Sequence, residues 1–113
     1  MIDCPDDALL LMEQSRYNNV GVIFDMAHAF YRNEDTADYI YTAGKNLKHI
    51  HFTDYDRRPP GTNGVDFYSV MRALKDVDYQ GYVTMEIGFT RSTGSDSISR
   101  QSIEFLKSIE TQL

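Results

Sequence analysis

Three apolar stretches of the 113-residue sequence each carry a side chain that can bind a metal ion or move a proton. Asp25 ends the stretch at 20–25, His51 lies near the end of 47–53, and Glu86 lies near the end of 82–87. Two carboxylates and one imidazole make an oxygen-rich ligand set with some nitrogen character. Such a set favours Mn²⁺, Mg²⁺ or Co²⁺ over a thiolate-type zinc site. A divalent metal site is therefore predicted if the three residues converge.

Each of these residues, taken alone, also has an ordinary structural explanation. An aspartate at a strand end usually caps a helix or forms a turn. His49 and His51 alternate, so they point to the same sheet face, where a histidine pair can simply be packed and hydrogen-bonded. Glu86 is more unusual, because a carboxylate in an apolar central strand is costly unless it is paired, protonated or metal-bound. Three such coincidences at three consecutive strand ends favour the functional interpretation.

The elements that must position these residues alternate between helix and strand. The three apolar stretches are typical of buried strands, and the charged, proline-rich segment 54–64 is predicted to be a loop. Helices are expected from a cap at Asp3 or Asp6, from the capping region 33–36 to Gly44, from Val65 onward, and at the C-terminal end. This order predicts an α/β fold, an initial helix followed by three parallel strand-helix units, with the strand ends side by side.

Composition limits the classes of protein. A length of 113 residues allows one domain and falls far short of the roughly 250 residues of a complete eightfold β/α barrel. The single cysteine, Cys4, cannot form an internal disulfide, which favours a cytoplasmic location. No apolar run approaches the roughly 20 residues of a membrane span. A net charge of −6 is the opposite of what nonspecific nucleic-acid binding needs, so neither membrane nor nucleic acid is expected as a partner.

The motifs together resemble a known superfamily. They are Asp-Met-Ala-His at 25–28, His-Ile-His at 49–51 with Arg57 six positions after the second histidine, and Val-Thr-Met-Glu at 83–86. In this order they resemble the last three β/α units of xylose-isomerase-like TIM barrels, especially ketose 3-epimerases and hydroxypyruvate-isomerase-like proteins. The resemblance covers nearly the whole chain. It implies that residues 1–113 form a partial TIM barrel, the single C-terminal portion of a (β/α)8 barrel.

The resemblance also implies a role for each site residue. Asp25, His51 and Glu86 match metal ligands of the family, and Glu86 in addition matches an acid-base catalyst. His28 and Arg57 match residues that contact the substrate. The implied cofactor is a divalent ion (Mn, Mg or Co), and the implied substrate is a small sugar or sugar phosphate. The implied reaction is isomerisation or epimerisation by proton transfer through an enediolate.

One part of the family pattern is missing from the sequence. The family uses a second glutamate, at the end of an earlier strand, as a metal ligand and partner acid-base group. Glu13 lies on a predicted helix and does not match that position. We therefore expect three of four ligands and one of two catalytic carboxylates in a fragment or truncated member. Such a chain is expected to form a homo-oligomer or to need the N-terminal portion of the barrel.

Two other interpretations remain open. The first is an apurinic-site endonuclease-like enzyme of the same superfamily, whose D-x-x-H region also resembles residues 25–28. That group has a further D-x-H motif, whereas residues 55–61 read Tyr-Asp-Arg-Arg-Pro-Pro-Gly. The second is a noncatalytic, self-associating partial-barrel module, because three parallel strands leave unpaired sheet edges.

Overall fold

The computed structural model describes residues 5–88 and 94–113. Asp3 and Cys4, considered above as a helix cap and a marker of location, lie outside these residues. The elements follow in the order α1 (Pro5–Ser15), β1 (Val22–Asp25), α2 (Met26–Tyr31), α3 (Thr36–Ala43), η1 (Gly44–Asn46), β2 (Leu47–Phe52), η2 (Tyr55–Arg57), α4 (Phe67–Asp76), β3 (Tyr82–Met85) and α5 (Ser95–Glu110). Within the described ranges, no helix combines the length and apolar character needed to cross a membrane.

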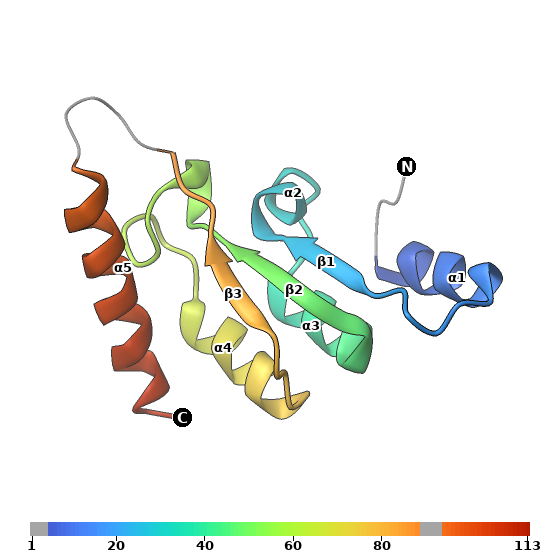
Figure 1. The fold of residues 1–113 in the computed structure, drawn as a ribbon. Coiled ribbons are helices and arrows are strands. Elements are labelled where there is room, and N and C mark those ends of the chain that lie inside the picture. The colour runs from blue at the N-terminus through green and yellow to red at the C-terminus, as the bar shows by residue number, and fades with distance from the viewer. Residues whose placement is uncertain (1–4, 89–93) are drawn as a thin grey trace.

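The three strands form one parallel sheet in the order β1-β2-β3. Asp25 is the register partner of His51, and His51 is the partner of Thr84. All three strand arrows in Figure 1 point the same way, so their carboxyl ends meet at one edge of the sheet. The predicted α/β fold with parallel strand-helix units is confirmed, and its shape is that of a partial TIM barrel.

The two faces of the sheet differ in their packing. One face packs against α3 and α4, and its buried core includes Phe24, Ile50, Phe52 and Phe67. On the other face Ile23 and Tyr82 are 65% and 85% exposed. The radius of gyration, 14.7 Å, exceeds the roughly 13 Å expected for a compact domain of this length. The chain is therefore a helix-backed sheet with one open face, although parallel sheets are normally covered on both faces.

Short polar caps fix where the helices begin. Asp25, Asp35 and Asp66 precede α2, α3 and α4, and each side chain accepts a hydrogen bond from a backbone N–H in the first turn. Such caps satisfy amide groups that have no partner within the helix. The helix α3 ends at Gly44, whose φ of +51° suits a residue without Cβ. The expected helix between the 33–36 capping region and this glycine is thus confirmed.

Three local features were missed or placed differently in the sequence analysis. The six-residue helix α2 follows β1 directly and was not predicted, although Asp25 was considered as a possible helix cap. The loop at 54–64 contains the short 3₁₀ helix η2. Strand β3 is an edge strand that ends at Met85, so Glu86 lies just beyond the strand and not inside a central, apolar one.

Candidate metal centre

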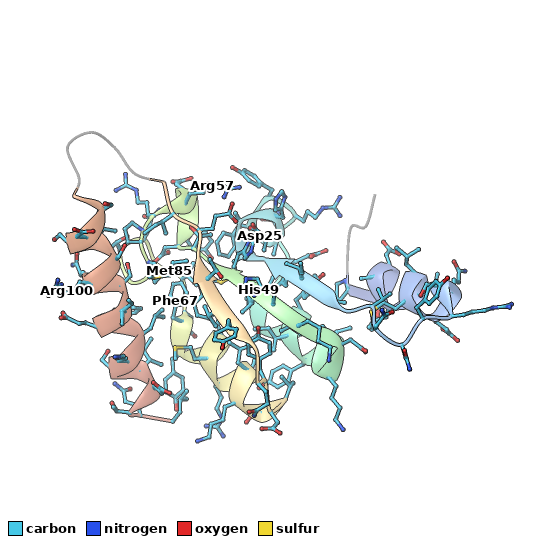
Figure 2. The ribbon with its side chains drawn as sticks, viewed as in Figure 1. Asp25, His49, Arg57, Phe67, Met85 and Arg100 are labelled. Carbon is cyan, nitrogen blue, oxygen red and sulfur yellow. The ribbon has the colours of Figure 1, made fainter. Side chains whose placement is uncertain are left out.

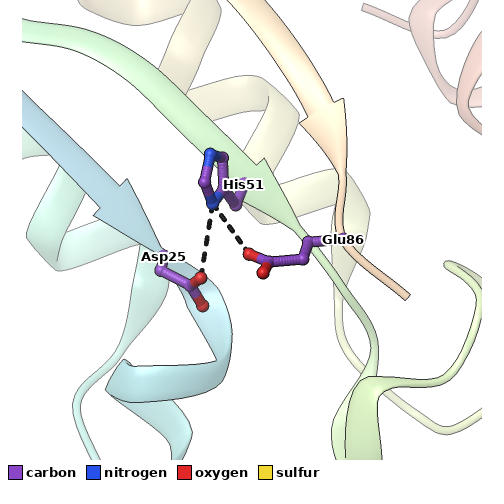
Figure 3. Close-up of side chains that lie close together, drawn as sticks. All are labelled: Asp25, His51 and Glu86. Carbon is purple, nitrogen blue, oxygen red and sulfur yellow. Dashed lines mark hydrogen bonds and ion pairs between the residues drawn. The ribbon is translucent and has the colours of Figure 1, made fainter. Parts of the chain in front are cut away.

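The three candidate ligands come from the ends of the three strands. Asp25 is the last residue of β1, His51 is the last but one of β2, and Glu86 follows β3. Each offers one ligand atom, and these atoms all lie within 4.8 Å of one another. Figure 3 shows the imidazole of His51 above the two carboxylates, with dashed contacts to both. The parallel register therefore brings together residues that are 26 and 35 positions apart.

The Nδ1 atom of His51 is the centre of this group. It lies 2.8 Å from Oε2 of Glu86 and 3.4 Å from Oδ2 of Asp25. Both partners are hydrogen-bond acceptors when ionised, and a bare imidazole nitrogen is an acceptor as well. Three acceptors facing one another repel, so a positive group must sit between them. That group is either a proton on Nδ1 or a metal ion.

Glu86 divides its two carboxylate oxygens between neighbours. While Oε2 contacts His51, Oε1 lies 3.7 Å from Nη1 of Arg57. The Arg57 side chain reaches the site from η2, and Figure 2 shows its label above the carboxyl end of β3. The Glu86 and Arg57 side chains are 48% and 40% exposed, so solvent weakens their attraction. A guanidinium at this position can bind an anionic or hydroxyl oxygen of a ligand.

Asp25 acts both as a helix cap and as a candidate ligand. Its Oδ1 accepts a hydrogen bond from the Ala27 N–H at 2.9 Å, and its Oδ2 faces His51. Partial burial alone raises the pKa of Asp25, but its interactions with Glu86, the Ala27 N–H and His51 outweigh this effect. The pKa of Asp25 therefore lies below its ordinary value, and the carboxylate form that a metal ion needs is favoured.

His28 lies close to this group without joining it. It is exposed near the end of α2, and its charge helps to lower the pKa of Asp25. Asp25 and His28 also line the same groove, of about 450 Å³, which runs between α1 and β1. This position is compatible with the predicted role of His28 in contacting substrate.

The donor set fits a divalent cation. Ligand atoms about 2.1 Å from an octahedral ion lie about 3 to 4 Å from each other. The spread of the three candidate atoms, up to 4.8 Å, is close to that range, and a small rotation of the exposed Glu86 side chain can close the difference. Asp25, His51 and Glu86 would hold the ion. Carboxylate and imidazole donors suit Mn²⁺, Mg²⁺ or Co²⁺.

One supporting residue was not assigned a role from the sequence. The His49 ring packs edge-on against the His51 ring, with centroids 5.0 Å apart, and its Nε2 lies 2.9 Å from Oγ1 of Thr84. Both histidines thus lie on one sheet face, as their alternation predicts. The ring of His49 limits how far His51 can rotate. The His-x-His spacing could have indicated the supporting role of His49, whereas no feature of the sequence indicated its contact with Thr84.

The fold and the site define an α/β chain with parallel strands and a candidate metal-binding triad at their carboxyl ends. The model of the xylose isomerase-like TIM barrel family matches residues 1–109. The chain belongs to the xylose isomerase-like TIM barrel family. This agrees with the resemblance carried by the motifs at 25–28, 49–57 and 83–86.

The chain is similar in sequence to several sugar epimerases. The chain is 30% identical over 95 residues to a D-psicose 3-epimerase from Ruminiclostridium cellulolyticum, an alignment that covers 84% of this chain and 32% of the relative. It is 28% identical over 107 residues to a 3-dehydro-D-guloside 4-epimerase from Escherichia coli, covering 95% and 40%. The chain therefore spans between about a third and two fifths of the length of these relatives.

Solved structures show the same arrangement. The D-psicose 3-epimerase from Clostridium cellulolyticum H10, solved with D-tagatose, superposes with a TM-score of 0.84 at 24% identity, covering 96% of this chain and 44% of that one. The 3-keto-D-glucoside 4-epimerase from E. coli gives a TM-score of 0.84 at 26% identity, covering 96% and 41%. The first likeness is evidence for the fold alone. Together they show that the fold of this chain corresponds to part of the fold of these longer proteins.

Proposed function

We propose that this chain is part of a divalent-metal-dependent sugar isomerase or epimerase that moves a proton through an enediolate. The observation that carries the proposal is the convergence of Asp25, His51 and Glu86 at the strand ends. The sugar epimerases among its relatives favour this function over the two alternatives considered from the sequence. A cytoplasmic location is part of the proposal.

Each residue has a separate task in this proposal. Asp25 and His51 hold the ion, which when bound supplies a Lewis acid that stabilises negative charge on a substrate oxygen. Glu86 is both a ligand and the base that takes the proton from carbon, since its side chain is half exposed and open to a ligand. His28 and Arg57 bind the remaining oxygens and orient the sugar.

The proposed substrate is a small ketose or ketose phosphate. An arginine beside an acidic catalyst can bind hydroxyl oxygens as well as phosphate, so the site is compatible with either. The names of the relatives favour a ketose changed at carbon 3 or 4. D-psicose is therefore the first substrate to test.

The open sheet face supports a partner for this chain. Ile23 and Tyr82 lie exposed on the face that carries the site. Apolar surface of this kind is stabilised when another polypeptide covers it. We propose that the face is covered either by the N-terminal portion of a barrel or by a second copy of the chain. Sedimentation measures the second case: an oligomer is expected for the chain alone, and a stable monomer would count against self-association.

Hydrogen exchange at the sugar tests the proposed reaction. The protein, in the full length that its gene encodes, is incubated with Mn²⁺ and D-psicose in D₂O, and NMR follows deuterium entering at carbon 3. Glu86→Gln removes the base and should slow exchange by about 10²–10⁴-fold. Glu104→Gln, on the exposed side of α5, is the matched control and should leave the rate unchanged.

Two results would contradict the proposal. One is exchange at an equal rate in the wild type and Glu86→Gln. The other is a wild-type protein that binds Mn²⁺ and exchanges no proton of any ketose or ketose phosphate. Nicking of abasic DNA by that protein would instead support the endonuclease alternative.

A further inference from the structure

A buried carboxylate outside the triad organises the loop that follows β2. Asp54 is fully buried, yet among the contacts the structure gives, no lysine, arginine or histidine side chain reaches its carboxylate. Its charge is balanced by backbone N–H groups alone. Oδ1 accepts from two of them at 2.9 and 3.0 Å, and Oδ2 accepts from three at 3.0 to 3.1 Å; the donors are Tyr55, Gly61, Thr62, Asn63 and Val65.

The loop gathered around this carboxylate has an unfavourable backbone shape. Asp56 and Arg57 are consecutive residues with φ of +57° and +55°, the left-handed region that L-amino acids seldom adopt. Such conformations persist when surrounding contacts determine them. The Asp54 side chain accepts from the N–H of Tyr55, just before this pair, and the Asp54 N–H donates to the carbonyl of Arg58, just after it, at 2.8 Å. The left-handed pair is thus enclosed by bonds to one residue.

This loop is joined to the candidate site at two points. The guanidinium of Arg57 faces Glu86 at 3.7 Å, and the carbonyl of Arg57 accepts from the Gly88 N–H at 2.8 Å. In addition, the Glu86 N–H donates to the carbonyl of Phe52, the last residue of β2. The backbone on both sides of Glu86 is therefore attached to the segment between β2 and the loop.

We propose that Asp54 is a positioning residue that places Arg57 against Glu86. It acts through the loop backbone, since no contact given by the structure joins its side chain to the triad. Loss of its acceptors releases the left-handed pair, and both the guanidinium and the carbonyl of Arg57 then leave the end of β3. The role of Arg57 in holding substrate rests on the proposed function, whereas the placement of Arg57 beside Glu86 is independent of it.

The variant Asp54→Asn tests the placement in the metal-free, full chain. An amide has nearly the same shape but replaces one acceptor oxygen with an NH₂ group, which then faces backbone N–H donors. Amide hydrogen exchange is measured at Gly88, whose N–H does not contact Asp54. We expect exchange at Gly88 to be at least tenfold faster. The side-chain NMR signals of Arg57 should move to the positions that they have in Glu86→Gln.

The control variant is Asp66→Asn. Asp66 also accepts a backbone N–H bond, but at the start of α4, and its loss should leave Gly88 and Arg57 unchanged. If Asp54→Asn does not fold, Asn63→Ala provides the same readouts. It removes only the 2.9 Å bond from Asn63 to the Tyr55 carbonyl within the loop, so a smaller acceleration at Gly88 is expected.

Faster exchange at Gly61 and Thr62 with no change at Gly88 or Arg57 would overturn the proposal, because Asp54 would then serve its own loop alone. Mn²⁺ is then added to the same samples, and paramagnetic broadening at His51 is recorded. The broadening should persist in Asp54→Asn, since all three candidate ligands remain. Absence of broadening in the wild type would count against the proposed function, whereas the Gly88 and Arg57 readouts would still decide the role of Asp54.

Discussion

The Nδ1 atom of His51 lies 2.8 Å from Oε2 of Glu86, although 35 residues separate the two in the chain. The contact exists because β2 and β3 are parallel neighbours, so that both strands end at the same edge of the sheet. The same edge carries Asp25 through the pairing of β1 with β2. A site assembled in this way depends on the register of the strands, and each of its members can be tested separately.

Removal of a ligand should weaken metal binding. Asp25→Ala and Glu86→Ala each take one donor from the triad, and each is expected to lower Mn²⁺ affinity at least tenfold, about 1.4 kcal/mol. Electron paramagnetic resonance titration of free Mn²⁺ measures the affinity. Asp66→Ala serves as the control because its carboxylate caps α4 away from the site. Unchanged affinity in both ligand variants would remove the proposed metal site.

Loss of the substrate-binding side chains should affect the sugar more than the metal. Arg57→Ala removes a charged donor near Glu86, and a lost hydrogen bond to a charged group costs about 1.5–3 kcal/mol. We therefore expect kcat/KM for a ketose to fall about tenfold to hundredfold, with Mn²⁺ affinity changed about twofold or less. His28→Ala should act in the same direction. A fall in metal affinity as large as the fall in kcat/KM would assign Arg57 to the metal site.

The contribution of Asp25 to stability should depend on pH in the acid range. Its pKa in the folded chain lies below the ordinary value of 3.8, so its stabilising effect is complete above that pH. The effect is lost as the pH falls through the folded-state pKa. At pH 7 without metal, Asp25→Ala should lower the free energy of unfolding by about 1 kcal/mol, the usual value of a helix cap.

Urea unfolding of the wild type and Asp25→Ala at several pH values measures this difference. The gap between the two proteins should narrow as the pH drops below about 3.8. A gap that widens on acidification would mean that the folded state raises the pKa of Asp25.

Two glycines with positive φ should differ in their tolerance of alanine. A Cβ at Gly61, with φ of +89°, would lie 2.8 Å from the Phe105 ring, whereas a Cβ at Gly44, with φ of +51°, would meet nothing within 4 Å. Gly44→Ala should cost about 1–3 kcal/mol from backbone strain alone, because φ of +51° with ψ of −127° is a conformation that L-residues rarely adopt. Gly61→Ala should cost about 2–4 kcal/mol, because overpacking is added to strain. If Gly44→Ala and Gly61→Ala unfold at the same urea concentration, α5 moves away from the new methyl group at residue 61 without a cost in stability.

Local sequence predicted much of this fold because its signals act over short distances. Strands were predicted from the apolar, β-branched stretch that ends at Asp25 and from the stretch 47–53, and both form. The capping region at 33–36 and Gly44 correctly predicted the two ends of a helix. The alternation of strands and helices implied parallel pairing. From that pairing alone, the meeting of Asp25, His51 and Glu86 at one edge could be predicted.

Features that depend on distant partners required the tertiary structure. Glu86 was expected inside a central strand. In the structure β3 is an edge strand that ends before Glu86, so the Glu86 side chain is half exposed. The Asp25 side chain caps α2 with one oxygen and faces His51 with the other, a double use that sequence spacing does not reveal.

The residue types and their order thus determined which side chains could form a site. The alternation of strands and helices implies parallel pairing, and parallel pairing brings the strand ends together. Only the tertiary structure decided how that site is supported. Asp54 reads in sequence as a polar loop residue, and it is buried beneath five N–H groups because the loop brings residues 61–65 back to the end of β2. A buried charge needs hydrogen-bond partners in the folded structure. The partners of Asp54 are backbone N–H groups, whose positions cannot be predicted from residue types.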